Sequence, residues 1–150
     1  MSEGGMVGMN PRVDGDTFIL PVRVYYEDTD AGGVVYYANY LKFAERARTE
    51  MLRHVGLENS TLQEQDGIAL VVRRLEVDYK QPARLDDLLD VCLTLTKIGG
   101  ASLQGEQRIL RGDDELAHIK IVLASMKLSG GPGRLPENIR NLLQPFLKLK

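Results

Sequence analysis

The sequence predicts an α+β domain in which an antiparallel sheet packs against one long helix, with a short helix near the C-terminal end. Length is the first observation, because 150 residues suffice for one hydrophobic core and leave no room for a second. The second is a single long stretch, residues 40–55, in which apolar residues recur at helical spacing. The third is a change to a period of two after that stretch, which is typical of strands.

A tail, a strand and a loop precede the helix. Residues 1–16 are rich in glycine and polar side chains, so we expect a flexible tail. Residues 18–26 are rich in β-branched and aromatic types and predict a strand, which Pro21 places at a sheet edge or at a bulge. Asn39 is the expected N-cap of the helix, and Gly56 is its expected C-terminal stop.

Four strands are expected after the helix, over residues 68–79, 91–95, 103–110 and 116–128. The short turns between them predict an antiparallel meander, which the first strand extends to a five-stranded sheet over residues 17–130. Residues 131–150 form a C-terminal extension, in which Pro136 can open a short helix. One helix cannot cover both faces of such a sheet, and two edges stay open. The architecture therefore predicts self-association.

Composition excludes several classes of protein. The net charge of −2 and the pI near 5.7 do not provide the basic excess that nucleic-acid binding requires. The single Cys92 cannot form an intramolecular disulfide or a zinc cluster, and its apolar surroundings indicate a core thiol. Neither a signal peptide nor a run of about 20 apolar residues is visible, so we expect a cytoplasmic protein without membrane insertion.

The densest group of unusual residues is the loop YEDTDAGGVVYYANY, over residues 26–40. Together with LKFAERARTEMLRHVGL and VVRRLEVDYKQPARLDDLLDV, it resembles the 4-hydroxybenzoyl-CoA thioesterase family, especially its YbgC-like branch associated with the Tol–Pal system. The resemblance covers residues 22–128. It implies the hotdog fold, in which an antiparallel sheet wraps a central helix. It also implies dimers, often joined into tetramers, with active sites at subunit interfaces.

The same resemblance assigns the catalytic carboxylate to Asp30, the second acid of the D-x-D segment. A carboxylate can hydrolyse a thioester as a general base or as a nucleophile, and the sequence leaves both routes open. Asp28 is expected to shape the turn by accepting backbone amides, while Gly32 and Gly33 allow a sharp turn and a close approach of substrate. Read alone, an acidic segment with two glycines is usually a solvated turn. A calcium loop is excluded because the fifth and twelfth positions from Asp28 are glycine and asparagine.

Tyr37 is a departure from the YbgC-like branch, which has histidine seven residues after the catalytic acid; the hydroxybenzoyl-CoA branch has tyrosine there. With a reference pKa of about 10, tyrosine is no base near neutrality, but it can donate a hydrogen bond or present a flat wall to the acyl group. The family also takes an oxyanion donor from the segment after the long helix. The matching stretch is residues 67–70, with the backbone N–H of Ala69 as the expected donor.

Coenzyme A carries several phosphates, so cations are expected near its site. Arg73, Arg74 and Arg84 follow the proposed oxyanion segment, although such a run also fits a solvated face. His54 and His118 have no nucleophilic partner nearby and are interpreted as structural. The full predicted substrate-binding set is Asp28, Gly32, Gly33, Val34, Leu70, Arg73, Arg74 and Arg84.

The resulting hypothesis is an acyl-CoA thioesterase that cleaves short-chain or aromatic acyl groups without a metal or another cofactor. Acyl carrier protein is an alternative carrier, for which Arg46, Arg48 and Arg53 on the helix could supply a basic surface. A non-catalytic hotdog protein that binds acyl thioesters or serves as a scaffold is the alternative of a different class. A protein that only binds thioesters would have no chemical need for the carboxylate of Asp30. A hotdog dehydratase is disfavoured because its histidine-centred loop is not visible.

Overall fold

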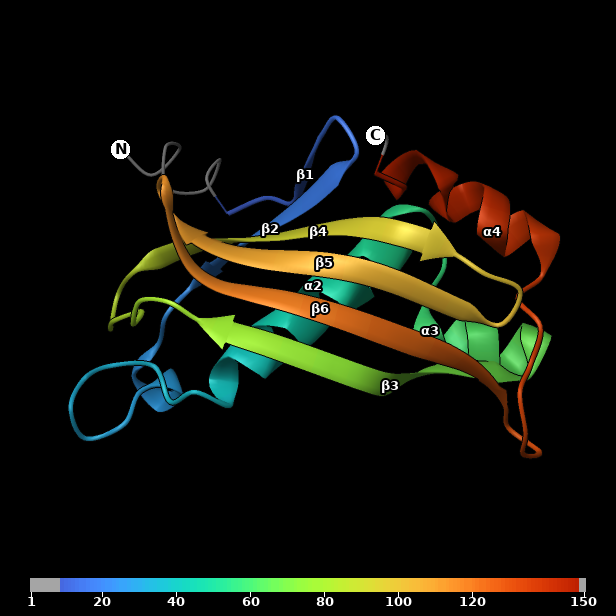
Figure 1. Cartoon of the computed structure of the whole chain (residues 1–150), viewed down its shortest axis with the longest axis horizontal. Helices are drawn as coiled ribbons and strands as arrows, with labels where there is room; N and C mark the ends of the chain where they lie inside the picture. The colour runs from blue at the N-terminus through green and yellow to red at the C-terminus, as the bar shows by residue number, and fades with distance from the viewer. Residues whose placement is uncertain (1–8, 149–150) are drawn as a thin grey trace.

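The computed structural model describes residues 9–148 and contains one antiparallel sheet of order β1-β2-β4-β5-β6-β3 (Figure 1). The strands are β1 (Arg12–Asp14), β2 (Thr17–Arg23), β3 (Ile68–Tyr79), β4 (Leu88–Ile98), β5 (Ser102–Arg111) and β6 (Asp114–Lys127). Every neighbouring pair is antiparallel. The sheet has six strands and not the expected five, because the short β1 adds a strand at one edge.

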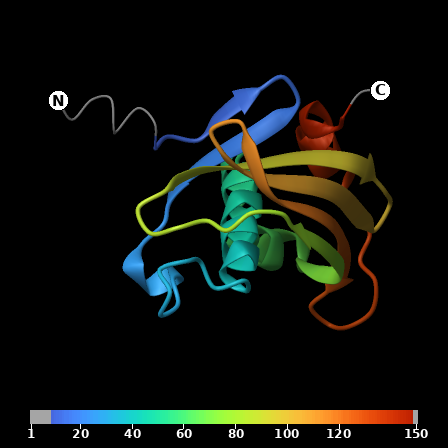
Figure 2. The same ribbon diagram turned by 60° about the vertical axis from the view of Figure 1, so that its left-hand side comes forward.

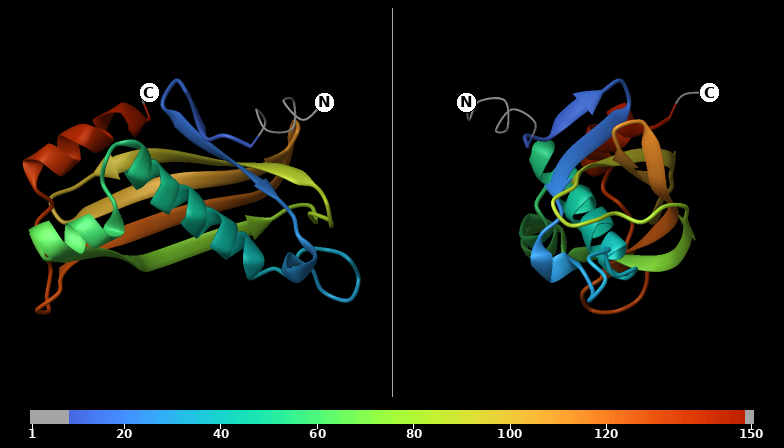
Figure 3. Two further views of the ribbon diagram at one scale, coloured as in Figure 1. Left: turned by 180° about the vertical axis from the view of Figure 1, so that it is seen from behind. Right: turned by 90° about the vertical axis from the view of Figure 1, so that its left-hand side faces the viewer.

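Helix α2 (Asn39–His54) lies in the concave face of the sheet, which curves around it (Figures 2 and 3). Its buried face includes Phe43, Ala44, Ala47 and Met51 at the predicted helical spacing. Inward-facing strand residues such as Ile109 complete the core. Gly56 follows the helix with a φ of +83°, so the predicted stop is confirmed. The predicted hotdog architecture is present.

The strand after the helix is placed differently from the predicted meander. Strands β4, β5 and β6 are consecutive neighbours, but β3 pairs with β6 at the far edge. The reason is the connection over residues 80–87, which crosses the end of the helix between β3 and β4. Its Ala83 N–H donates to the Tyr40 hydroxyl at 2.8 Å, and its Ala83 carbonyl accepts the Val35 N–H at 2.8 Å. These contacts keep β3 away from β4.

Part of the expected N-terminal tail is ordered as β1. Residues 12–14 pair with residues 17–19 of β2, and an Arg12–Asp90 ion pair of 3.0 Å fixes the hairpin to β4. Pro21 lies beyond the β1 pairing and faces only β4, so its predicted edge position is confirmed. Residues 1–8 of the predicted tail lie outside the described residues.

The chain after the sheet belongs to the same core. Helix α4 (Glu137–Leu143) and the following 3-10 turn η3 (Gln144–Phe146) bury Ile139, Leu143 and Phe146. The Phe146 ring meets the fully buried Phe18 edge-on at 6.3 Å. The extension predicted for residues 131–150 therefore packs against the hotdog core as far as residue 148, the last one described. Two short helical turns, α3 (Asn59–Thr61) and η2 (Leu62–Asp66), connect α2 to β3.

An ion network joins the β3–β4 connection to the β5–β6 hairpin. Glu115 accepts hydrogen bonds from the Arg108 guanidinium and the Lys80 ammonium. These two bonds lower the pKa of Glu115 to about 2.

No helix among residues 9–148 is both long enough and apolar enough to cross a membrane.

Candidate active site

The loop that carries the D-x-D segment lies at the N-terminal end of α2, beside the C-terminal end of β3 (Figures 1 and 3). It begins with the short turn η1 (Tyr26–Asp28) after β2. An isolated bridge pairs Thr29 with Val35, and another pairs Val34 with Arg84. Backbone pairing on both sides therefore holds the loop in one shape against the β3–β4 connection.

Asp28 is the internal anchor of this loop. Its side chain is buried, with one oxygen accepting the Tyr25 N–H at 2.8 Å and the other accepting the Asn39 Nδ2–H at 3.0 Å. The predicted turn-shaping role is confirmed. The predicted N-cap role of Asn39 is wrong, because Asn39 is the first residue of α2 and Asp28 engages its side chain.

Asp30 is exposed at the tip of the loop. Its Oδ1 accepts the Gly32 N–H at 2.9 Å, its N–H donates to the Val34 carbonyl at 2.9 Å, and its carbonyl accepts the Gly33 N–H at 3.1 Å. Gly33 has a φ of +77°, as the predicted sharp turn requires. Among the described residues, none donates a hydrogen bond to the Asp30 Oδ2. This oxygen can therefore accept a further hydrogen bond.

Tyrosine rings line the side of the loop that faces β3. The Tyr37 ring lies 4.8 Å from the Tyr36 ring and meets the Tyr79 ring edge-on at 6.2 Å. The Tyr79 hydroxyl donates to the Tyr37 carbonyl at 3.0 Å, which ties the end of β3 to the start of α2. Tyr37 is 61% exposed, and burial raises the pKa of Tyr79. The cluster presents exposed aromatic surface between the loop and the end of β3.

The predicted site residues fall into two groups in space. The loop and its bridge to the β3–β4 connection bring together Asp28, Asp30, Gly32, Gly33, Val34, Tyr37 and Arg84. Arg84 is exposed there. Ala69 and Leu70 instead begin β3, ten residues before Tyr79, which corresponds to roughly 33 Å of extended strand. Within one chain, Asp30 and the Ala69 N–H do not meet.

Arg73 and Arg74 lie in the middle of β3 and are also remote from the loop. The register with β6 shifts between Val72 and Arg74, so Arg73 is the extra residue of a bulge. Arg74 lines an open depression on the outer sheet face together with Glu76 and Lys120. The sheet separates that depression from α2.

A polar pair in the core was missed by sequence reasoning. The Gln107 side chain is fully buried and donates to the Ala44 carbonyl at 2.8 Å, while its Oε1 accepts Arg48 Nη1–H at 3.0 Å. Burial lowers the pKa of the Arg48 guanidinium. The sequence did contain a signal for this pair, because Gln107 stands at an inward position of the strand alternation, where an apolar residue is expected.

Among the described residues, no three histidine, cysteine or acidic side chains are grouped to hold a metal.

Comparison with known proteins places this arrangement in a family. A family model described as the thioesterase superfamily matches residues 32–118, which include Tyr37, Ala69, Leu70 and the predicted arginines. The chain belongs to the thioesterase superfamily. It is 47% identical over 125 residues to the acyl-CoA thioester hydrolase YbgC of Escherichia coli, covering 81% of this chain and 92% of that protein. It is 49% identical over 111 residues to the acyl-CoA thioesterase YbgC of Haemophilus influenzae, covering 74% and 82%.

Solved structures agree with this placement in the superfamily. A Bartonella henselae protein described as a probable thioesterase superposes with a TM-score of 0.77 at 39% identity, over 80% of this chain and 99% of that one. The predicted YbgC-like membership and the hotdog fold are confirmed, and the chain is a thioester hydrolase.

Proposed function

We propose that this chain hydrolyses acyl-CoA thioesters and that Asp30 is its catalytic carboxylate. The supporting observation is the geometry of Asp30, which is exposed on a loop anchored by the buried Asp28 and keeps one carboxylate oxygen without a hydrogen bond among the described residues. An oxygen fixed in this way can act on a carbonyl brought to the loop with little further ordering. The YbgC relatives act on acyl-CoA, which supports the choice of carrier.

Two routes are compatible with this geometry. As a general base, Asp30 takes a proton from water, the resulting hydroxide attacks the thioester carbonyl, and the sulfur leaves and is protonated as CoA thiol. As a nucleophile, Asp30 attacks the carbonyl and expels the thiolate, and water then cleaves the mixed anhydride. In both routes we expect Tyr37, which is exposed on the same loop, to donate a hydrogen bond or to contact the acyl group. Since the carboxylate either activates water or is itself the nucleophile, neither route requires a metal or an organic cofactor.

A homodimer formed along β3 would complete the site. β3 is an edge strand, and its residues 71–76 are all exposed, including Val72 at 48% and Leu75 at 37%. A long exposed edge of this kind favours pairing with another strand. An antiparallel pairing about a two-fold axis between residues 73 and 74 would place Val72 opposite Leu75 of the partner subunit. The same register would place Ala69 opposite Asp78 of the partner subunit.

Such a pairing resolves the separation of the two predicted groups. Asp78 immediately precedes Tyr79, whose hydroxyl is bound to the catalytic loop. Ala69 itself faces Met126 of β6 in a hydrogen-bonded position, so the N–H that one subunit turns toward the Asp30 loop of the other is that of the adjacent Leu70, which could donate to the thioester oxygen as charge develops. This pairing accounts for a site that one chain leaves incomplete. Assembly of dimers into tetramers stays a prediction from the resemblance.

CoA fits the described surface better than acyl carrier protein does. Arg84 lies exposed beside the loop, where it can meet a CoA phosphate. The basic helix surface expected for a carrier protein is weakened, because Arg53 pairs with Glu50 and Glu58 and Arg48 binds Gln107. A cytoplasmic location stays a prediction from the sequence.

Steady-state hydrolysis across a panel of acyl-CoA esters tests the proposal. Asp30→Asn should lower kcat by roughly 10²–10⁴ and leave the urea midpoint of unfolding almost unchanged, since Asp30 is exposed. Asp14→Asn makes the same chemical change on the exposed strand β1, at the end of β2 away from the loop, and should retain the wild-type rate. Full activity in Asp30→Asn would overturn the assignment of the carboxylate.

A further inference from the structure

The β3–β4 connection contains a reverse turn that is held by one side chain from the β5–β6 hairpin. The hairpin, the connection and the Asp30 loop lie at the same end of the molecule (Figure 1). Arg111 ends β5, and its Nη1–H donates to Asp87 Oδ2 at 2.9 Å and to the Pro82 carbonyl at 3.2 Å. The same Asp87 oxygen accepts the Arg84 N–H at 2.9 Å. One guanidinium therefore fixes the connection on both sides of Arg84.

The turn also contains a backbone conformation that its surroundings enforce. Asp86 has a φ of +71° and is the only non-glycine residue with a positive φ among the described residues. Its N–H donates to the Val24 carbonyl at 3.1 Å, and its own carbonyl accepts Arg23 Nη1–H at 2.8 Å. Such a conformation persists only where the surrounding contacts impose it, and it is found often at functional sites. These contacts hold the turn in one shape.

The residues just before this turn pair with the Asp30 loop. Residues 83–85 run beside residues 33–35, joined by two backbone hydrogen bonds of 2.8 and 3.2 Å and by one bridge. Together these two segments form the loop ladder. The Asp30 N–H donates to the Val34 carbonyl in the middle of the ladder at 2.9 Å, and the Asp30 carbonyl accepts the Gly33 N–H at 3.1 Å. The place of Asp30 therefore depends on the loop ladder.

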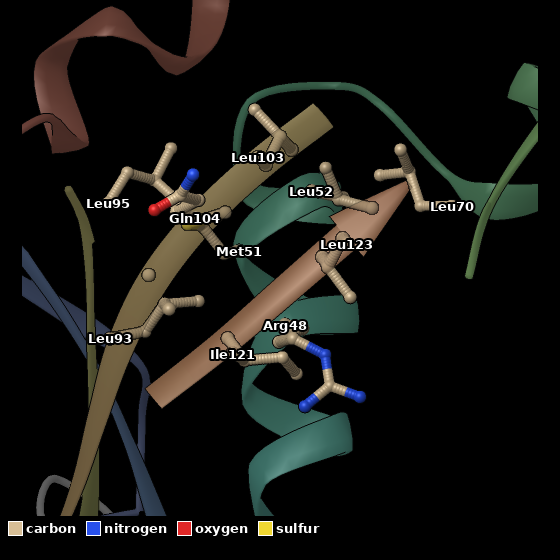
Figure 4. A pocket seen from close by; sticks show the side chains of 11 residues that line it. Arg48, Met51, Leu52, Leu70, Leu93, Leu95, Leu103, Gln104, Ile121 and Leu123 are labelled. Atoms are coloured by element: carbon tan, nitrogen blue, oxygen red, sulfur yellow. The ribbon is translucent and has the colours of Figure 1, made fainter. Parts of the chain in front are cut away.

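Arg48 shows that a half-buried arginine does not by itself reach this region. It lies beside a small void between α2 and the sheet, near apolar side chains such as Ile121 (Figure 4). Its guanidinium binds Gln107, and within residues 9–148 it has no hydrogen bond to the connection or to the Asp30 loop. Arg111 differs because both of its hydrogen-bond acceptors belong to the connection.

We propose that Arg111 is a positioning residue for thioester hydrolysis, which acts through Asp87 and the loop ladder to hold the Asp30 carboxylate in place. The proposal rests on the proposed catalysis by Asp30. A group that acts on a carbonyl works over a narrow range of positions, and a displacement of about 1 Å can lower the rate by roughly 10²-fold. Loss of the guanidinium releases the turn and lets the ladder shift. Because Arg111 acts on the position of Asp30, kcat should depend on it more than KM does.

Three variants of the full chain test this role. Arg111→Met removes both hydrogen bonds and keeps an aliphatic stem. Arg111→Lys is the conservative variant, because both bonds come from one nitrogen and an ammonium group can donate to both oxygens. Arg53→Met is the matched control. It also loses ion pairs, with Glu50 and Glu58, but it lies in the last turn of α2, at the end away from the Asp30 loop.

Steady-state kinetics on an acyl-CoA ester gives the first readout. Arg111→Met should lower kcat by roughly tenfold to hundredfold with KM unchanged within about twofold, and Arg111→Lys should recover most of this loss. Arg53→Met should keep the wild-type kcat. In a double-mutant cycle, Arg111→Met and Asp87→Asn should not be additive, because Arg111 acts through that carboxylate. A wild-type kcat in folded Arg111→Met, or fully additive effects, would overturn the proposal.

Should Arg111→Met fail to fold, Arg111→Gln takes its place, because its amide can keep one of the two bonds. The same kinetic results then support or overturn the proposal.

Hydrogen exchange separates this proposal from the proposed function. The N–H groups of Asp30 and Gly33 should exchange roughly tenfold or more faster in Arg111→Met than in the wild type, and at the wild-type rate in Arg53→Met. Unchanged exchange in Arg111→Met would overturn the positioning role and leave catalysis by Asp30 standing. An active Asp30→Asn variant, by contrast, would overturn the proposed catalysis whatever the exchange rates are.

Discussion

Replacing Asp28 should loosen the loop that holds Asp30, and the size of the effect follows from two hydrogen bonds. Both bonds end on the buried Asp28 carboxylate, one from the Tyr25 N–H at 2.8 Å and one from the Asn39 side chain at 3.0 Å. Hydrogen bonds to a charged group contribute about 1.5–3 kcal/mol each, and an unpaired buried donor costs a similar amount. Asp28→Ala should therefore lower the free energy of unfolding by about 3–5 kcal/mol.

Asp28→Asn provides the matched comparison. Its carbonyl oxygen can keep one of the two bonds, but its amide nitrogen would face the other donor, so the loss should be about half as large. Urea unfolding followed by circular dichroism measures both variants against the wild type. A double-mutant cycle with Asn39→Ala should show a coupling of about 1 kcal/mol or more, because the two side chains touch.

Activity gives the second readout of Asp28→Ala. The rate of thioester hydrolysis should fall even in the folded fraction, because the loop loses the anchor that orients Asp30. A loss of stability below about 1 kcal/mol, or additive effects of the Asp28 and Asn39 changes, would refute the anchoring role.

Three further predictions concern the scaffold. Tyr40→Phe should lower the free energy of unfolding by about 1–3 kcal/mol in urea titrations, because a buried backbone N–H loses its acceptor. Glu115 has a pKa of about 2, below its ordinary 4.5, so its stabilisation is present above pH 4.5 and is lost as the pH falls toward 2. Urea midpoints of the wild type should therefore approach those of Glu115→Gln below pH 3. Val72→Lys with Leu75→Lys should give monomers in sedimentation velocity and lose activity; active monomers would contradict the β3-paired site.

The features that sequence reasoning predicted correctly are local ones. The periodicity of α2 and the stop at Gly56 depend on neighbouring residues, so pattern and spacing sufficed. The same holds for the sharp turn at Gly33 and for the backbone bond to the Asp28 side chain. The catalytic assignment of Asp30 came from the family resemblance, because an acidic turn by itself also fits a solvated loop.

The features that sequence reasoning missed depend on contacts between distant segments. β3 pairs with β6 because Ala83 in the following connection binds the helix residue Tyr40, a contact across 43 positions. The three-residue β1 is too short for a pattern and depends on its neighbours in the sheet. Gln107 looked like any polar strand residue until the structure placed Arg48 beside it. Ala69 shows the same limit, because its distance from Asp30 depends on where β3 lies.

Mixing two inactive variants tests most directly whether Asp30 and the start of β3 act across a subunit interface. Asp30→Asn removes the carboxylate, and Leu70→Pro removes the backbone N–H at the open edge of β3 without removing a hydrogen bond to β6, so each variant alone should be inactive. Co-expression of the two chains should restore roughly a quarter of the wild-type rate per chain, because half of the random dimers are mixed and each has one intact site of two. An inactive mixture whose mixed dimers are present and folded would contradict the shared site.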